Sequence, residues 1–195
     1  MNSDHPAEYA SALGSALAAF DWSPVVAMAK SVTDAWHAGR QVFICGNGGS
    51  AANAMHIAND LIYGIGKNIG GGMKVTALPS NAAILTCLAN DLGYETIFSK
   101  QLTVLASRGD ILIALSGSGN SPNILRALEA ASSVGMDTYA ILGYSGGKAK
   151  SLAGTAIHFA VNDMQIAEDL QMVVGHMLMK MLAAGDQPRP STQAV

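Results

Sequence analysis

The sequence has few charged residues and no long hydrophobic run, and each shortage excludes a class of protein. Charged residues make up 13% of the 195 positions, with a net charge of −3. The chain therefore lacks the basic surface that neutralises a nucleic-acid backbone, and nucleic acid is not expected as a direct ligand. No apolar run approaches the roughly 20 residues that span a membrane, although half of the residues are hydrophobic. We expect these residues to be buried in a core and, because so few charges cover the surface, between the subunits of an oligomer.

Cysteine is also scarce. The two cysteines, Cys45 and Cys87, stand in apolar contexts and lack C-x-x-C spacing, and the N-terminus lacks the basic and then apolar residues of a secretory signal. Both absences favour a reducing cytoplasm. The length suits one domain, which we assign to residues 1–184. We expect the polar segment 185–195 to be disordered because it has too few apolar residues to fold.

Apolar spacing predicts an α/β fold. Residues 7–19 and 24–37 have the three- and four-residue spacing of amphipathic helices, with Ser23 as the N-cap of the second helix and Pro24 at its first position. Short apolar segments typical of parallel strands lie at 41–45, 74–78, 110–115, 138–142 and 156–161. Helical segments at 50–61, 82–88, 95–106 and 122–134 supply the crossovers, and 165–182 forms a closing helix. The sequence thus predicts a doubly wound, five-stranded parallel sheet with N-terminal helices.

Two runs rich in glycine, serine and asparagine lie about 70 residues apart, each between a predicted strand and a predicted helix. They are residues 46–50 (GNGGS) and 116–121 (SGSGNS). Small residues let backbone N–H groups approach an anion, hydroxyls donate to it, and a helix N-terminus favours negative charge. Because both runs fall at the carboxyl ends of strands, where such sheets bind ligands, we interpret them as two walls of one sugar-phosphate site.

The first run has two other interpretations. Its spacing Gly46-x-Gly48-x-x-Ala51 satisfies the loose dinucleotide fingerprint, but residues 74–79 (KVTALP) lack the acidic residue that holds a ribose in such sites. The run can also be a tight turn without a ligand. The second run is harder to explain as a plain turn, because its three serines and asparagine carry a helix-propensity cost that a plain turn does not require.

Histidines and carboxylates gather on two predicted helices. His56 and Asp60 are spaced i, i+4 and project from one face, so they can share a metal ion or a proton path. Glu168 and His176 lie about 12 Å apart along the last helix, so they meet one ion only by leaning together or with help from a neighbouring subunit. Two imidazoles and two carboxylates suit Zn²⁺ or another divalent metal. Alternatively, the histidines are packing residues in the core or at an interface and bind no metal, and Asp60 caps a helix or pairs with another residue.

The pattern as a whole resembles the sugar isomerase (SIS) domain family, and within it the phosphoheptose isomerase branch. The resemblance covers nearly the whole chain and rests on the residues GNGGSAA at 46–52, His56, Asn90-Asp91, S-x-SGNS-x-N at 116–123, and the last helix around Glu168 and His176. It implies a flavodoxin-like fold and isomerisation of sedoheptulose 7-phosphate to an aldose heptose 7-phosphate. It also implies a homotetramer with active sites at subunit interfaces and, in some members, a bound zinc ion.

The resemblance implies roles for individual residues. The substrate-binding set is Asn47, Gly48, Ser50, Asp91, Ser116, Ser118, Asn120 and Ser121. Within it the serines hold the phosphate, and Asn47 and Asp91 contact sugar hydroxyls. The metal ligands are His56, Asp60, Glu168 and His176. Isomerisation needs a base, an acid and a stabilised enediolate; Asp60 takes the base role and His176 the acid role, although a carboxylate bound to metal is a compromised base.

Four positions depart from the family pattern: Asp60 replaces Glu, Gly64 replaces Arg, Gly117 replaces Thr and Glu168 replaces Gln. The loss of Arg removes a bidentate partner for phosphate, whereas Glu168 adds a negative ligand that favours a metal. These departures keep two non-catalytic alternatives open, an adaptor similar to replication-initiator-associating family members and a sugar-phosphate sensor. The nearly complete set of acid, base and anion-binding groups favours the enzyme.

Overall fold

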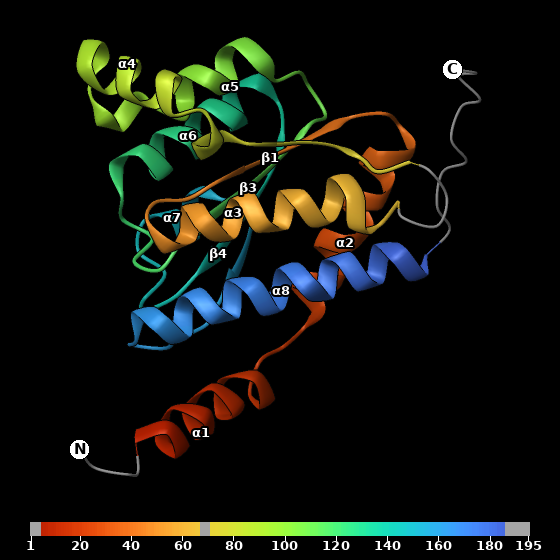
Figure 1. Cartoon of the computed structure of the whole chain (residues 1–195), viewed down its shortest axis with the longest axis vertical. Coiled ribbons are helices and arrows are strands. Elements are labelled where there is room, and N and C mark those ends of the chain that lie inside the picture. Colours follow the sequence, from red (N-terminus) through yellow and green to blue (C-terminus); the bar gives the residue numbers. More distant parts are fainter. Residues whose placement is uncertain (1–4, 67–70, 186–195) are drawn as a thin grey trace.

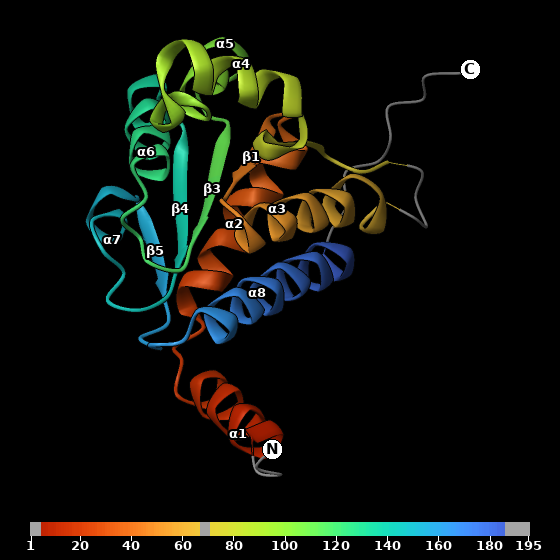
Figure 2. The ribbon, with the colours of Figure 1, turned by 60° about the vertical axis from the view of Figure 1, so that its left-hand side comes forward.

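The computed structural model describes residues 5–66 and 71–185; the remainder of the predicted disordered tail, 186–195, lies outside these ranges. Five parallel strands form one sheet in the order β2-β1-β3-β4-β5; β1, β3 and β4 are labelled in Figure 1, and β5 in Figure 2. They are β1 (Gln41–Cys45), β2 (Lys74–Ala77), β3 (Ile111–Ser116), β4 (Asp137–Leu142) and β5 (Thr155–His158). The predicted doubly wound parallel sheet is confirmed, and its winding direction reverses between β1 and β3.

Helices cover both faces of the sheet because side chains alternate along each strand. Val42 and Ile44 pack with α2 (Ser23–His37), α3 (Gly49–Asn59) and α8 (Met164–Ala184). Phe43 and Cys45 face the opposite layer, which contains α5 (Ser99–Leu105), α6 (Pro122–Val134) and α7 (Ala149–Leu152). The helix α4 (Ala82–Leu92) has no buried residue. Burial of strands on both faces explains their continuous apolar sequence.

The first helix, α1 (His5–Ala18), also has no buried residue. In both views it lies beyond α8, away from the sheet (Figure 1 and Figure 2). The Tyr9 hydroxyl donates to the Asp169 carboxylate of α8 at 2.5 Å, and this bond raises the pKa of Tyr9 to about 12. Over the described ranges no single helix has the length and apolar character to cross a membrane. The helices α1 and α2 have that length and apolar character only when they are taken together, and the chain bends by 71° between them.

The start of α2 corrects the predicted cap, because the N-cap is Trp22 and not Ser23. Ser23 is the first residue of the helix and not its cap. The Asp21 carboxylate accepts hydrogen bonds from the Ser23 backbone N–H at 3.0 Å and from the Ser23 hydroxyl at 2.7 Å. Asp21 thus satisfies a backbone donor of the first turn, and the two bonds lower the pKa of Asp21.

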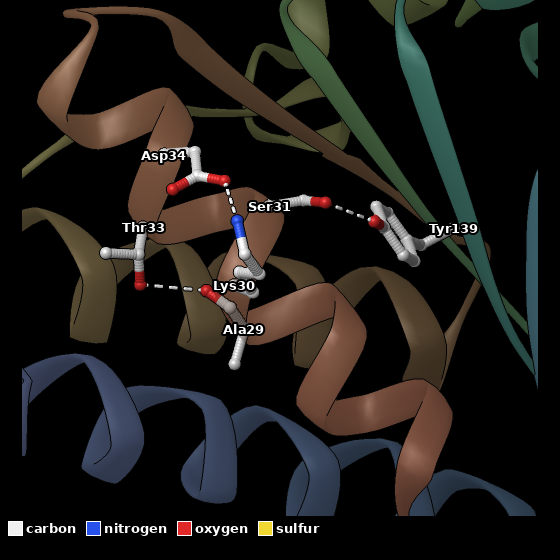
Figure 3. Close-up of polar contacts among 6 residues, drawn as sticks. All are labelled: Ala29, Lys30, Ser31, Thr33, Asp34 and Tyr139. Atoms are coloured by element: carbon white, nitrogen blue, oxygen red, sulfur yellow. Dashed lines mark hydrogen bonds and ion pairs between the residues drawn. The ribbon is translucent and has the colours of Figure 1, made fainter.

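Polar contacts along α2 are shown in Figure 3. The Tyr139 hydroxyl of β4 donates to Ser31 Oγ at 2.8 Å, which ties the helix to the sheet. Lys30 and Asp34 pair at 2.6 Å on the exposed side, and this contact raises the pKa of Lys30. The helix thus has one face fixed to the sheet and one face in solvent.

Several boundaries differ from the predictions. After α3 the chain continues as a π-helical turn, η1 (Asp60–Gly64), with Ile65 N–H bonded to the Asp60 carbonyl at 3.0 Å. The segment predicted as one helix at 95–106 is divided into η3 (Tyr94–Thr96) and α5, and β2 is followed by η2 (Leu78–Ser80). The strand β5 ends at His158, and the short α7 was not predicted.

Candidate active site

A pocket of about 250 Å³ lies at the carboxyl ends of β1 and β3, where the winding of the sheet reverses. Both predicted runs line it, and the start of α8 forms a third wall. The lining residues are Asn47, Gly48, Gly49, Ser50, Leu115, Ser116, Gly117, Ser118, Ser121, Met164 and Glu168. The structure therefore brings together two loops about 70 residues apart in the sequence.

The loop between β1 and α3 brings backbone close to the pocket. Gly48 has φ +56°, a conformation that side chains other than glycine rarely adopt. A Cβ at Gly49 would collide with the Glu168 carboxylate. Ser50 is buried, and its Oγ accepts a hydrogen bond from Gln171 Nε2 at 3.0 Å, so its hydroxyl hydrogen can still be donated to a ligand.

The loop between β3 and α6 supplies three hydroxyl groups. Ser116 Oγ accepts a bond from Gly119 N–H at 3.0 Å, and Ser118 Oγ accepts one from Asn120 N–H at 3.2 Å. Both hydroxyl hydrogens remain available as donors. Ser121 is the N-cap of α6, but its side chain caps no backbone group. With the N-terminus of α6, these hydroxyls form a donor-rich wall suited to an anion.

Two predicted substrate-binding residues, Asn120 and Asp91, do not line this pocket in a single chain, and their contact with a substrate stays a prediction. Asn120 Oδ1 accepts a bond from Lys148 N–H at 3.1 Å, and its Nδ2 donates to the Ser118 carbonyl at 3.3 Å. Its amide therefore joins neighbouring loops. Asp91 lies near the end of the outer helix α4, where its carboxylate accepts bonds from the Cys87 thiol at 3.5 Å and from Asn90 Nδ2 at 2.8 Å.

His56, Asp60 and His176 form a compact group. Asp60 Oδ2 lies 3.6 Å from His56 Nε2 and 3.7 Å from His176 Nε2, and the two Nε2 atoms are 3.3 Å apart. Tetrahedral zinc with ligands at about 2.1 Å places neighbouring ligand atoms about 3.4 Å apart. The triangle therefore fits such an ion. Asp60 Oδ1 has a different neighbour, Asn59 Nδ2 at 3.5 Å.

Glu168 lies outside this group in a single chain, so its assignment as a fourth metal ligand stays a prediction. It lies eight residues before His176 on α8, a rise of about 12 Å, and its carboxylate lies beside Gly49 in the pocket. The acidic residue expected to favour a metal instead faces the predicted anion site. Among the described residues that line the pocket, Glu168 carries the charge and no Lys or Arg balances it.

The pocket and the histidine group lie along one pair of helices, because α3 and α8 run side by side in the same direction (Figure 1). Glu168 lies beside Gly49 at the start of the pair. In the middle, Asn53 Nδ2 donates to Gln171 Oε1 at 3.1 Å and to the Glu168 carbonyl at 3.0 Å. His56 meets His176 farther along.

Gly175 allows this close approach of the two helices. A Cβ at Gly175 would lie 2.5 Å from Ile57 Cγ1, far inside van der Waals contact. Ile57 is the residue after His56, and Gly175 is the residue before His176. The glycine therefore sets the helix separation at which the two imidazoles meet.

Sequence reasoning missed Met164 as a pocket residue and placed Glu168 elsewhere. Met164 is the first residue of α8, and a Cβ at Gly117 would lie 2.5 Å from its sulfur. The available signal was topological. A helix that follows a parallel strand begins at the carboxyl edge of the sheet, so the start of the closing helix has to lie near both loops.

Comparisons with known proteins agree with this geometry. Residues 7–143 match the SIS domain family, the class of protein that the sheet and its two loops define. The phosphoheptose isomerase of Akkermansia muciniphila is 39% identical over 157 residues, 80% of this chain and 82% of that protein. That of Chlorobaculum parvum is 34% identical over 178 residues, 89% and 84% of the two chains.

A solved structure leads to the same family. The phosphoheptose isomerase GmhA from Neisseria gonorrhoeae is 27% identical with a TM-score of 0.84, and the match covers 94% of this chain and 97% of that one. The chain belongs to the phosphoheptose isomerase family of SIS-domain proteins. The family and the flavodoxin-like fold predicted from the sequence are thereby confirmed.

Proposed function

We propose that this protein is an aldose–ketose isomerase that interconverts sedoheptulose 7-phosphate and an aldose heptose 7-phosphate through an enediolate. The names of its relatives support this activity. The observation that carries the proposal is the arrangement along α3 and α8, with an anion pocket at the start and a His-Asp-His group farther on. From Ser50 to His56 is six residues and from Glu168 to His176 is eight, so the rise is about 9 to 12 Å. An extended seven-carbon chain spans about 7.5 Å, since each of its six bonds advances it by about 1.25 Å, and its phosphate ester brings the length to about 10 Å.

We place the substrate phosphate at the loop between β3 and α6. Its three hydroxyls and the N-terminus of α6 supply donors. The opposite side of the pocket carries the Glu168 carboxylate beside Gly49, which repels a phosphate dianion. The loop between β1 and α3 then meets the sugar, with Ser50 as a donor to hydroxyl groups. Phosphate binding far from the reacting carbons orients them.

His56, Asp60 and His176 are the proposed ligands of a divalent ion, and zinc suits two imidazoles and one carboxylate. When bound, such an ion polarises oxygen atoms of the substrate. Glu168 remains available as a further contact in an assembly of several chains. The triangle of ligand atoms, with sides of 3.3, 3.6 and 3.7 Å, supports this assignment.

Proton transfer is assigned to Asp60 and His176. Asp60 accepts the proton from the carbon next to the carbonyl and returns it to the former carbonyl carbon, and His176 delivers a proton to oxygen from Nδ1, because its Nε2 belongs to the ligand triangle. The two Asp60 oxygens have different neighbours, because Oδ2 faces the histidines and Oδ1 faces Asn59. One oxygen can therefore bind a metal while the other acts as the base.

We also propose a homotetramer in the cytoplasm, with active sites at subunit interfaces. The side chains of His56 and His176 are 53% and 54% exposed, and Met55, Ile62 and Tyr63 are exposed on the same segment. A second copy packed there would bury apolar surface and shield the reacting groups from water. Both cysteines are free thiols, as expected in a reducing compartment.

The test is turnover by the zinc-loaded protein in D₂O. Sedoheptulose 7-phosphate should be converted to an aldose phosphate, with deuterium incorporated at C2, as followed by NMR. D60N and H176Q should each lower kcat by about 100-fold or more. The matched control is D34N, which changes an exposed carboxylate on α2 (Figure 3) and should retain activity. Binding of the sugar phosphate without conversion by the wild type would support the sensor or the adaptor instead.

A further inference from the structure

Two asparagine side chains join the loops that form the pocket. Asn47 Nδ2 donates to Asn123 Oδ1 at 2.9 Å, and Asn123 Nδ2 donates to Asn47 Oδ1 at 2.7 Å. The two bonds close a ring across the switch point between β1 and β3. We propose that Asn123 is a positioning residue for the pocket: through Asn47 it fixes the distance between the two loops and thereby the fit of the phosphorylated ligand. Only the identity of this ligand rests on the proposed function.

The surroundings of Asn123 fix the orientation of its amide. Asn123 is 2% exposed and lies at the second position of α6, after Pro122. Its Oδ1 also accepts a bond from the Ile124 N–H at 3.0 Å. Since only the oxygen can accept from a backbone N–H, its Nδ2 has to face Asn47. A buried amide without its partner is costly, so the bridge is strongly preferred to an open arrangement.

The same contacts change the role expected for Asn47. Its Oδ1 accepts from Asn123 and also from the Tyr94 hydroxyl at 3.1 Å. A carbonyl oxygen has two lone pairs, and both are used. The resemblance implied that Asn47 contacts sugar hydroxyls. Its Oδ1 cannot accept a further hydrogen bond from such a hydroxyl without breaking this arrangement. Its carbonyl oxygen acts in positioning rather than in contact with the sugar.

Both ends of the bridge lie next to pocket residues. Gly48 follows Asn47, and Ser121 precedes Asn123 by two residues; both line the pocket. The backbone pairing of β1 with β3 ends at Cys45 and Ala114. Beyond that point the amide bridge spans the two loops directly, so its loss allows the donors of one wall to move relative to those of the other.

The experiment compares N123A with a control variant that also removes a buried side-chain amide. Gln101 is also a buried amide, and its Nε2 donates to the carbonyls of Leu78 at 3.1 Å and Ile97 at 2.7 Å, away from the pocket lining. Both N123A and Q101A should lower Tm. Only N123A should raise KM for sedoheptulose 7-phosphate, by about tenfold, with kcat changed by less than about threefold. A KM unchanged in N123A would overturn the proposal and leave Asn123 a stability residue.

N123S provides a second measurement if N123A does not fold. It keeps a hydrogen-bonding group at the start of α6 but lacks the Nδ2 that donates to Asn47. It should raise KM by about tenfold, whereas Y94F, which leaves both bonds of the bridge in place, should change KM by less than about threefold. An unchanged KM in N123S would overturn the proposal. If the wild type turns over no sugar, the proposed function fails, and the bridge is tested by calorimetry with inorganic phosphate. Phosphate should then bind about tenfold more weakly to N123A than to Q101A; equal binding would overturn the proposal.

Discussion

The substitution G175A tests whether the spacing of α3 and α8 forms the histidine group. A Cβ at this position would lie 2.5 Å from Ile57 Cγ1 and 2.8 Å from its Cδ1, whereas ordinary contacts are 3.4–4 Å. The helices must therefore separate by about 1 Å, because a packed core cannot absorb the methyl group otherwise. The distance of 3.3 Å between the His56 and His176 Nε2 atoms should then exceed 4 Å, more than the roughly 3.4 Å between ligands of tetrahedral zinc.

Two quantities should change in G175A. Overpacking costs about 1–3 kcal/mol, and the better helix propensity of alanine offsets up to about 1 kcal/mol of it, so we expect a net loss of stability of up to about 2 kcal/mol. Misplacing a ligand should weaken zinc binding by about 10- to 100-fold. Differential scanning calorimetry measures the first effect, and competition with a zinc chelator measures the second.

A size exchange serves as the control for G175A. The variant I57A makes space opposite Gly175, so I57A/G175A should bind zinc more tightly than G175A, although I57A alone loses about 2–5 kcal/mol of stability by leaving a cavity. Zinc bound by G175A as tightly as by the wild type would refute the reasoning that the glycine sets the geometry of this group.

Three further predictions concern separate parts of the molecule. E168Q should lower KM for the sugar phosphate several-fold in steady-state assays, because it removes a negative charge from the pocket wall; an unchanged KM would place the phosphate out of reach of Glu168. The Tyr9 bond to Asp169 raises the pKa of Tyr9 to about 12, so the contact of α1 with α8 should be intact below about pH 10 and lost as pH rises through 12. The difference between the absorbance titrations of the wild type and of Y9F should show the Tyr9 midpoint at about 12. D169N should lower the pKa of Tyr9 to near 10. Burial raises the pKa of the Cys45 thiol to about 12, so a thiol reagent at pH 8 should modify Cys87 in the native protein and Cys45 only after unfolding.

The sequence was sufficient to predict the topology because the strands are continuous apolar segments separated by helical crossovers. The bounds of β1 and α6 match the predictions. The convergence of both loops also followed from a general rule, since the carboxyl ends of parallel strands share one edge. These features depend on local pattern and on connectivity, both of which can be read from one chain.

Sequence alone does not show where several side chains are directed. Asp91, which matches the family pattern, lies on the outer helix, and Glu168, which replaces the Gln of that pattern, lies beside Gly49. Sequence spacing gives their positions along a helix but not the helix packing that decides what they face. The resemblance placed Asn120 in the substrate-binding set, and its amide oxygen accepts a bond from the Lys148 N–H. Ser23 was assigned as a cap by residue type, but it is the first residue of α2.

The location of the two ends of the substrate tests the central claim most directly. In a crystal structure of the zinc-loaded protein with sedoheptulose 7-phosphate, the phosphate oxygens should lie within hydrogen-bonding distance of the Ser116, Ser118 and Ser121 hydroxyls, with C2 beside Asp60 and His176. A phosphate bound at the histidines, or a sugar bound on another face of the assembly, would contradict the account.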